Sequence, residues 1–218
     1  RDFCLSRGLG DVYKRQSYTF PVGPATVFVG DNTDGSALYS TACVYGGPSN
    51  NLDDCGNGNS AIGGGSGTAA GASYEFGDGF AAAVGYTGAG SSSSGLMSKE
   101  GADSFGGQLS YAADSFGASV TYGNVEDYSG SNDRNFWGLN GYWTPSEVGA
   151  VPSISVGYEQ GSAQNLPDTE QWFIGLQWDE AGPGTFGVAV GTIGASTNSP
   201  VEAGVHQSLS LIHIRRCR

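Results

Sequence analysis

The sequence predicts an all-β fold, an antiparallel up-and-down transmembrane β-barrel that is present as a partial barrel of about ten strands. Three observations predict it: short runs with alternating polarity, connections that are alternately tight and long, and aromatic residues near the ends of the runs. Only 38% of residues are hydrophobic and Gly contributes 38 of 218. No run approaches the roughly 18 apolar residues of a membrane helix. A membrane crossing would therefore be made by strands.

The strand-like runs are five to ten residues long and alternate most clearly in the second half of the chain. In 104–112, Phe105 and Leu109 share one face while Gln108 lies on the other. In 170–178, Trp172 and Ile174 likewise oppose polar or small residues. The ten predicted strands are 18–22, 25–30, 68–76, 80–88, 104–112, 116–124, 135–143, 151–158, 170–178 and 185–193.

The connections between these runs fall into two length classes. The short ones, at 77–79, 113–115 and 180–184, are built from turn-forming residues. The long, polar ones are expected at 31–66, 89–103, 125–133, 159–169 and from 194 onward. Outer-membrane barrels show this asymmetry between short periplasmic turns and longer extracellular loops.

Aromatic residues on the apolar faces stand near strand ends, and smaller residues occupy the middles. Amphipathic rings prefer the two membrane–water interfaces, so a barrel carries them as two girdles. A soluble β-sandwich would instead concentrate its rings where burial is deepest. The predicted girdle residues are Tyr74, Phe76, Phe80, Tyr86, Tyr111, Phe116, Tyr122, Trp137, Trp143, Tyr158, Trp172 and Trp178.

The polar partners of these apolar faces are the candidates for the lining of a pore. They are Ser73, Glu75, Gln108, Ser110, Ser119, Thr121, Asn140, Ser153, Ser155, Gln171 and Gln177. The alternative is that they form the solvated outer face of an ordinary sheet. The acidic residues concentrate in loops, which would bias the mouth of a pore toward cations.

Both termini differ in composition from the stretch between them. Residues 1–16 and 208–218 hold seven of the nine basic residues, whereas 17–207 hold two basic and 19 acidic ones. CLSRGLGDVYKRQ and SLSLIHIRRCR resemble translated adapter sequence, so we expect 1–16 and 208–218 to be artefacts outside the fold and 17–207 to be the barrel. The alternative is a pair of basic tails for an anionic surface.

Two cysteines remain in the predicted barrel once the termini are set aside. Cys43 and Cys55 lie in one Gly/Asn/Asp-rich loop, which favours a disulfide formed in an oxidising compartment over two free thiols. No metal site is expected, because His206 is the one histidine in 17–207.

Residues that carry chemistry are scarce, so the sequence predicts no enzyme and no cofactor. A single histidine leaves few candidates for acid–base or triad catalysis. The Gly-rich stretch at 63–71 precedes a strand, unlike a phosphate-binding loop, and DNTDG at 31–35 lacks the spacing and closing Glu of an EF-hand. A net charge of −12 argues against nucleic acid as a partner.

Several stretches resemble the C-terminal barrel of cyanobacterial outer-membrane porins, the carbohydrate-selective OprB-type or iron uptake porins. The resemblance covers roughly 17–193 and rests on SYTFPVGPATVFVG, GTAAGASYEFGDGFAAAVGY, FWGLNGYWTP and WFIGLQWDEAGPGTFGVAVG. It implies a fragment of a porin in the cell outer membrane, in contact with outer-membrane lipid and assembled in the parent protein as a homotrimer. The implied function is passive diffusion of small hydrophilic solutes: sugars, inorganic ions and iron. The alternative is a secreted or surface-attached β-rich adhesin or glycan-binding module.

Overall fold

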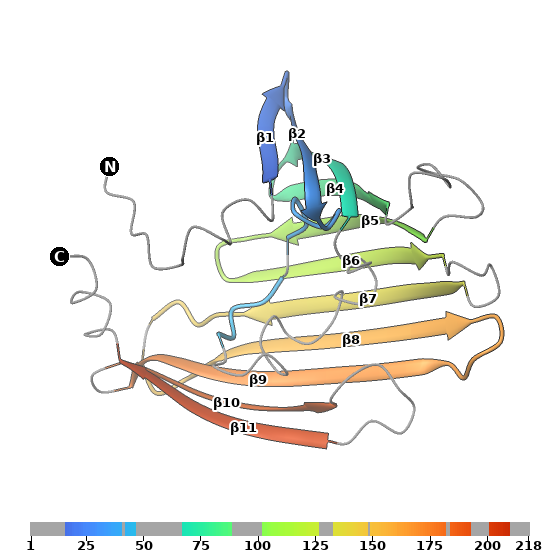
Figure 1. The fold of residues 1–218 in the computed structure, drawn as a ribbon. Coiled ribbons are helices and arrows are strands. Elements are labelled where there is room, and N and C mark those ends of the chain that lie inside the picture. The colour runs from blue at the N-terminus through green and yellow to red at the C-terminus, as the bar shows by residue number, and fades with distance from the viewer. Residues whose placement is uncertain are drawn as a thin grey trace, which may run out of the picture.

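The chain folds as a single antiparallel sheet in which each strand pairs with the next one in sequence (Figure 1). The computed structural model describes residues 16–40, 42–46, 67–88, 102–126, 133–147, 149–181, 184–192 and 201–209. Its eleven described strands are β1 (Gln16–Val22), β2 (Ala25–Thr33), β3 (Gly67–Gly77), β4 (Phe80–Gly88), β5 (Asp103–Ala112), β6 (Phe116–Val125), β7 (Arg134–Trp143), β8 (Ser153–Ala163), β9 (Thr169–Ala181), β10 (Gly184–Thr192) and β11 (Val201–Leu209). The strand order is β1 to β11 without a crossover, which confirms the predicted all-β, up-and-down architecture.

The sheet is strongly curved and remains open, with β1 and β11 at its two edges (Figure 1). Tight turns stand at one end of the strands. Between β3 and β4, Asp78 and Gly79 both have positive φ, 53° and 84°, as a hairpin turn of type I′ requires. No helix in the described ranges is long and apolar enough to cross a membrane.

All ten predicted strands are present, and the structure adds an eleventh. β11 lies in the region that we expected to be loop from 194 onward, and it pairs with β10 from Val201 opposite Thr192 to Leu209 opposite Gly184. The sequence of β11 does alternate, with Val201, Ala203, Val205 and Leu209 at every second position, but Gln207 interrupts this series. Pairing along the edge of β10 therefore decides its conformation. The connection between β8 and β9 is also shorter than predicted, 164–168 instead of 159–169.

Three described residues of the two terminal segments belong to the edge strands β1 and β11. β1 begins at Gln16 and β11 ends at Leu209, so one residue of 1–16 and two residues of 208–218 belong to strands. The rest of both segments lies outside the described residues. Their assignment as artefacts stays a prediction.

The distribution of polar and apolar side chains is the reverse of that in a water-soluble sheet. Apolar side chains in the middle of strands are exposed, among them Val84 (59%), Leu139 (53%) and Leu109 (49%). Polar side chains on the same strands are buried, such as Thr121 (2%) and Ser155 (1%). Soluble proteins bury most apolar side chains and expose most polar ones. The sheet therefore presents an apolar face outward and a polar face inward.

Candidate functional site: the inner face and the segment that crosses it

Cross-strand pairing places all eleven predicted lining residues on one face of the sheet, here called the inner face. Side chains on one face are linked by direct pairing, and Ser110 pairs with Ser119, which pairs in turn with Asn140. Ser73 and Glu75 join this face through their partners on β4, Ala83 and Ala81. The remaining predicted positions follow by the same pairing: Gln108, Thr121, Ser153, Ser155, Gln171 and Gln177.

Side-chain hydrogen bonds between neighbouring strands organise the inner face. Gln108 Nε2 donates to Thr121 Oγ1 at 2.9 Å, and Gln171 Nε2 donates to Glu159 Oε1 at 3.1 Å. Glu159 is 1% exposed and was absent from the predicted lining, although its pairing with Gln171 puts it on the same face. The alternation within β8 could have identified it, because Glu159 continues the series of Ser153 and Ser155.

Residues 34–40 and 42–46, here called the inner segment, run across the inner face after β2 ends. Figure 1 shows this part of the chain crossing the middle of the sheet. Its backbone N–H groups donate to inner-face side chains of four different strands, β4, β5, β8 and β9, so its position is fixed along its length. The acceptors are Thr87, Gln108, Ser155 and Gln177.

The first attachment of the inner segment is a close approach of backbone to backbone. Gly35 N–H donates to Thr87 Oγ1 at 2.6 Å. A Cβ atom at Gly35 would lie 2.6 Å from the backbone nitrogen of Tyr86, and a Cβ atom at Gly85 would overlap the Gly35 carbonyl oxygen. Gly71 borders the same contact, because a Cβ atom at Gly71 would lie 3.3 Å from the carbonyl oxygen of Gly35. Glycine at these positions is what lets the segment lie directly on the sheet.

The far attachment of the inner segment is an aromatic contact on β9. The rings of Tyr45 and Phe173 lie 5.3 Å apart, and together with Ala189 they form a small buried cluster. The ring of Tyr45 occupies the space above Gly175, where a Cβ atom would come within 2.8 Å of it. Both Val44 and Tyr45 donate backbone N–H bonds to Ser155 Oγ, at 3.1 and 3.2 Å.

Cys43, one of the two cysteines of the predicted disulfide, lies beside this aromatic contact. Cys43 is disulfide-bonded and packs against the Tyr45 cluster. Cys55, its predicted partner, lies outside the described residues. The pairing of the two therefore stays a prediction.

The position of the inner segment corrects the expectation that 31–66 is an extracellular loop. β2 continues to Thr33, and the described residues after it lie against the inner face. A usable signal was present in the sequence: two short runs, Ala37 to Tyr39 and Ala42 to Tyr45, are apolar or aromatic within a stretch that is otherwise polar. Ala42 and Tyr45 are only 4% and 5% exposed, because they pack against the sheet.

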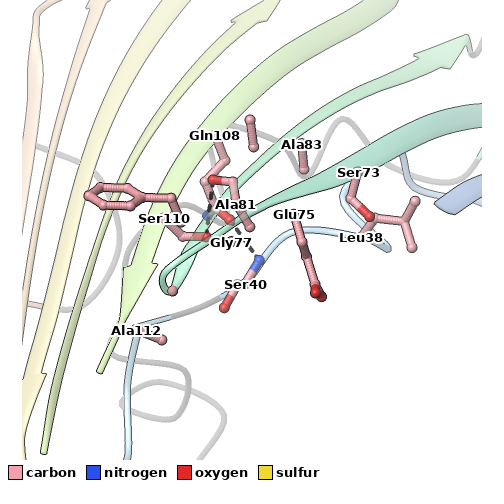
Figure 2. A pocket seen from close by; sticks show the side chains of 13 residues that line it. Leu38, Ser40, Ser73, Glu75, Gly77, Ala81, Ala83, Gln108, Ser110 and Ala112 are labelled. Atoms are coloured by element: carbon pink, nitrogen blue, oxygen red, sulfur yellow. Dashed lines mark hydrogen bonds between the residues drawn. The ribbon is translucent and has the colours of Figure 1, made fainter. Parts of the chain in front are cut away.

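A cavity of about 390 Å³ lies between the inner segment and strands β3 to β5. Figure 2 shows Glu75 and Ser73 on one side of it and Gln108 and Ser110 on another, with Leu38 and Ser40 contributed by the inner segment. Ser40 N–H donates to Gln108 Oε1 at 2.6 Å across this space. Its lining mixes apolar residues with the polar side chains of Ser40, Ser73, Glu75, Gln108 and Ser110. Glu75 is the one charged residue among the described residues that line it.

The attachment of the inner segment to the sheet is expected to weaken at alkaline pH because of Tyr39. Burial raises the pKa of Tyr39 from 10.0 to about 12, with the backbone of Gly85 acting in the opposite direction. The unfolded or detached segment would lose the phenol proton near pH 10, whereas the packed one keeps it, so attachment weakens as pH rises from about 10 to 12. Fluorescence of a probe at Ser40→Cys should report detachment in this interval. Tyr39→Phe should remove the dependence, and an unchanged profile would contradict the assignment to Tyr39.

The opposite face of the sheet, here called the outer face, carries all twelve predicted girdle residues. Ring pairs join neighbouring strands at both ends of the face: Phe80 and Tyr111 are 4.6 Å apart near the tight turns, and Tyr122 and Trp137 are 4.9 Å apart near the other end. Trp178 also pairs with Phe186, at 5.7 Å, which the predicted girdle omitted. The assignment of these rings to membrane interfaces stays a prediction.

Comparison with solved structures shows the fold. No family model matches the chain, and no curated protein matches it. A loop L8 deletion mutant of OmpT, an outer membrane protein of Vibrio cholerae, is similar with a TM-score of 0.52 and 17% identity, over 88% of this chain and 60% of that one. OmpT of the same organism, folded in vitro and in its trimer form, gives 0.48 and 15%, over 90% and 60%. This chain thus spans about 60% of the length of these structures.

This comparison bears on two expectations from the sequence. The prediction that the chain is not an enzyme is withdrawn, because the OmpT loop-deletion mutant shares the fold at 17% identity and a shared fold does not exclude catalysis. The specific likeness to cyanobacterial porins gains nothing from these matches, which are to proteins of Vibrio cholerae. What the comparison establishes is the all-β fold of outer-membrane β-barrel proteins.

Proposed function

We propose that the chain forms part of the wall of an outer-membrane pore through which small hydrophilic solutes diffuse passively. The observation that carries this proposal is the reversed sheet, with exposed Val84, Leu109 and Leu139 on one face and buried Thr121 and Ser155 on the other. In a lipid bilayer the outer face would contact acyl chains and the inner face would contact water and solute. A water-soluble adhesin would leave the apolar face without a partner.

The inner segment would set the width of the passage. It crosses the inner face from β4 to β9 and leaves the cavity at Glu75 between itself and the wall. The serine and glutamine side chains that line this cavity offer both donors and acceptors. Such a lining suits polar solutes of several kinds.

The proposed solutes rest partly on these polar residues and partly on the resemblance to porins. Sugars, inorganic ions and iron are all included in the proposal, the sugars and iron by the resemblance to carbohydrate-selective and iron uptake porins. The resemblance to porins suggests a homotrimer for the complete barrel.

Glu75 is expected to make the passage modestly selective for cations. Its side chain is exposed in the cavity. A carboxylate in a narrow passage of reduced dielectric stabilises cations and repels anions. The preference should fade with salt, since the Debye length falls from about 10 Å at 0.1 M to about 3 Å at 1 M.

Reversal potentials of the pore in planar bilayers under a salt gradient test this expectation. Glu75→Gln should lower the ratio of cation to anion permeability, most strongly at low salt. Asp78→Asn provides the control, because it removes a charge in the β3–β4 turn, at a residue whose positive φ Asn tolerates. Anion selectivity of the unsubstituted pore would contradict the charge argument. Absence of any conductance would contradict the pore itself.

A further inference from the structure

Two neighbouring rows of inner-face residues across β3, β4 and β5 have an alanine in the middle and a polar side chain on each side. Direct pairing gives Glu75, Ala81 and Ser110 in one row, and Ser73, Ala83 and Gln108 in the next. Neighbouring strands lie about 5 Å apart, so β3 and β5 are separated by about 10 Å. The short methyl groups between the polar side chains leave a hollow, which is the floor of the cavity of about 390 Å³.

The inner segment covers this hollow on the side away from the sheet, where Leu38 and Ser40 line it (Figure 2). Ser40 N–H donates to Gln108 Oε1 at 2.6 Å, and Gln108 Nε2 donates to Thr121 Oγ1 at 2.9 Å. Both polar ends of the Gln108 amide therefore hold the wall in place. The volume falls within the range of about 300–1,000 Å³ that is typical of small-molecule pockets.

Glu75 has no counter-charge in the described part of the chain. Its side chain is exposed in the cavity, and its carboxylate makes no hydrogen bond with another described residue. Arg134 is the one lysine or arginine among the described residues, and it begins β7 at the end of the sheet opposite the tight turns. Glu75 lies two residues before the end of β3, beside the β3–β4 turn. A cationic solute in the cavity would therefore meet a carboxylate that no described cation neutralises.

The composition of the lining favours an organic cation over a metal ion. Calcium takes about six to eight oxygen ligands, whereas the described lining contains a single carboxylate, that of Glu75. Hydrocarbon lies beside it instead, since Leu38, Ala81 and Ala83 face the same space. The apolar part of a solute would be removed from water against these side chains.

The polar side chains of the lining favour a primary ammonium group. Such a group donates three hydrogen bonds and accepts none. The Glu75 carboxylate and the hydroxyl groups of Ser73 and Ser110 supply acceptors. A quaternary ammonium group has no N–H and is bound by aromatic faces. Phe80, the one ring in the described lining, belongs to the outer face.

We propose that this cavity binds small organic solutes with one primary ammonium group and a short hydrocarbon chain. That such amines are a solute class of the passage rests on the proposed function. The ammonium group lies at Glu75 and donates to its carboxylate and to Ser73, and the hydrocarbon lies along Ala81 and Ala83, beneath Leu38. A pore needs binding that is favourable enough for entry and weak enough for release. The carboxylate is open to water, so the affinity is in the millimolar range.

A saturation-transfer NMR titration of the full chain, folded in a non-ionic detergent, tests the site with n-propylammonium chloride as the probe. We expect saturable binding with a millimolar dissociation constant. Glu75→Gln should weaken it about fivefold or more, because it removes a charged hydrogen-bond partner. n-Propanol, which has the same length but no charge, should bind more weakly by a similar factor. Glu147→Gln, which removes an exposed carboxylate between β7 and β8, is the matched control and should bind like the unsubstituted chain.

Ala81→Leu separates the effect of the cavity from that of the charge. The larger side chain fills the space between Glu75 and Ser110 while the carboxylate stays in place, so saturable binding of n-propylammonium should be lost. Circular dichroism establishes the folded state of each variant. If Ala81→Leu does not fold, Glu75→Gln decides the question, since its side chain is exposed.

The proposal is overturned if the folded, unsubstituted chain shows no saturable binding up to tens of millimolar n-propylammonium. Equal binding by folded Glu75→Gln, equal binding of n-propanol, or an equal loss in Glu147→Gln would overturn it as well. Binding that survives in folded Ala81→Leu would also do so, because it would mark a surface ion pair. Conductance in planar bilayers is measured separately. Binding without conductance would support the site and contradict the pore, whereas conductance without binding would overturn the site and leave the pore standing.

Discussion

Leu109→Lys is expected to destabilise the bilayer-inserted sheet by about 2–4 kcal/mol, the cost of a lysine at the middle of a lipid-facing strand. Leu109 is 49% exposed on the outer face and lies at the centre of β5, between Val120 on β6 and Ala82 on β4. A lysine there would have to move its ammonium group through acyl chains to reach water. Urea unfolding in lipid vesicles measures the difference.

Ser110→Lys is the matched control, because Ser110 is the next residue of the same strand and faces the cavity beside Glu75. A lysine there reaches water and a carboxylate, so we expect a change within about 1 kcal/mol. A soluble sheet would give the opposite ranking, since an exposed leucine is replaced by lysine at little cost in water. Equal effects at the two positions would contradict the assignment of the outer face to lipid.

Gly85→Ala is expected to displace the inner segment and to raise single-channel conductance. A Cβ atom at Gly85 would overlap the carbonyl oxygen of Gly35, and backbone on both sides prevents a simple adjustment. Overpacking of this kind costs about 1–3 kcal/mol. The attachment through Thr87 would be lost with it, which opens the passage that the segment narrows.

Gly107→Ala serves as the control for Gly85→Ala. Gly107 also lies in the middle of a strand, yet an added Cβ atom would meet only ordinary contacts, 3.7 Å from the Ala83 carbonyl oxygen. It should leave conductance unchanged and should hold or slightly raise stability, because alanine restricts the unfolded chain. Wild-type conductance in Gly85→Ala, measured in planar bilayers, would show that the inner segment does not limit the passage.

The strands and the two faces could be predicted because both depend on a local pattern. Alternation alone separates Leu109 from Gln108 and Ser110, and pairing between neighbours then aligns each face over the whole sheet. Strand ends were less predictable: β11 and the extension of β8 to Ala163 depend on an adjacent strand edge rather than on their own composition.

The inner segment could not be predicted in the same way. Its position depends on contacts across 52 residues, from Gly35 to Thr87, and across 131 residues, from Gly46 to Gln177. The apolar runs at 37–39 and 42–45 indicate that the segment could pack, but they do not show which strands it contacts.

Quenching of native tryptophan fluorescence by brominated lipids tests the central claim most directly. The four tryptophans of the chain, Trp137, Trp143, Trp172 and Trp178, are all girdle residues of the outer face. In vesicles whose lipids carry bromine near the headgroup, the account predicts strong quenching, and it predicts weaker quenching when bromine lies at the bilayer centre. A chain that stays monodisperse in buffer without detergent, with fluorescence unaffected by either lipid, would contradict the account.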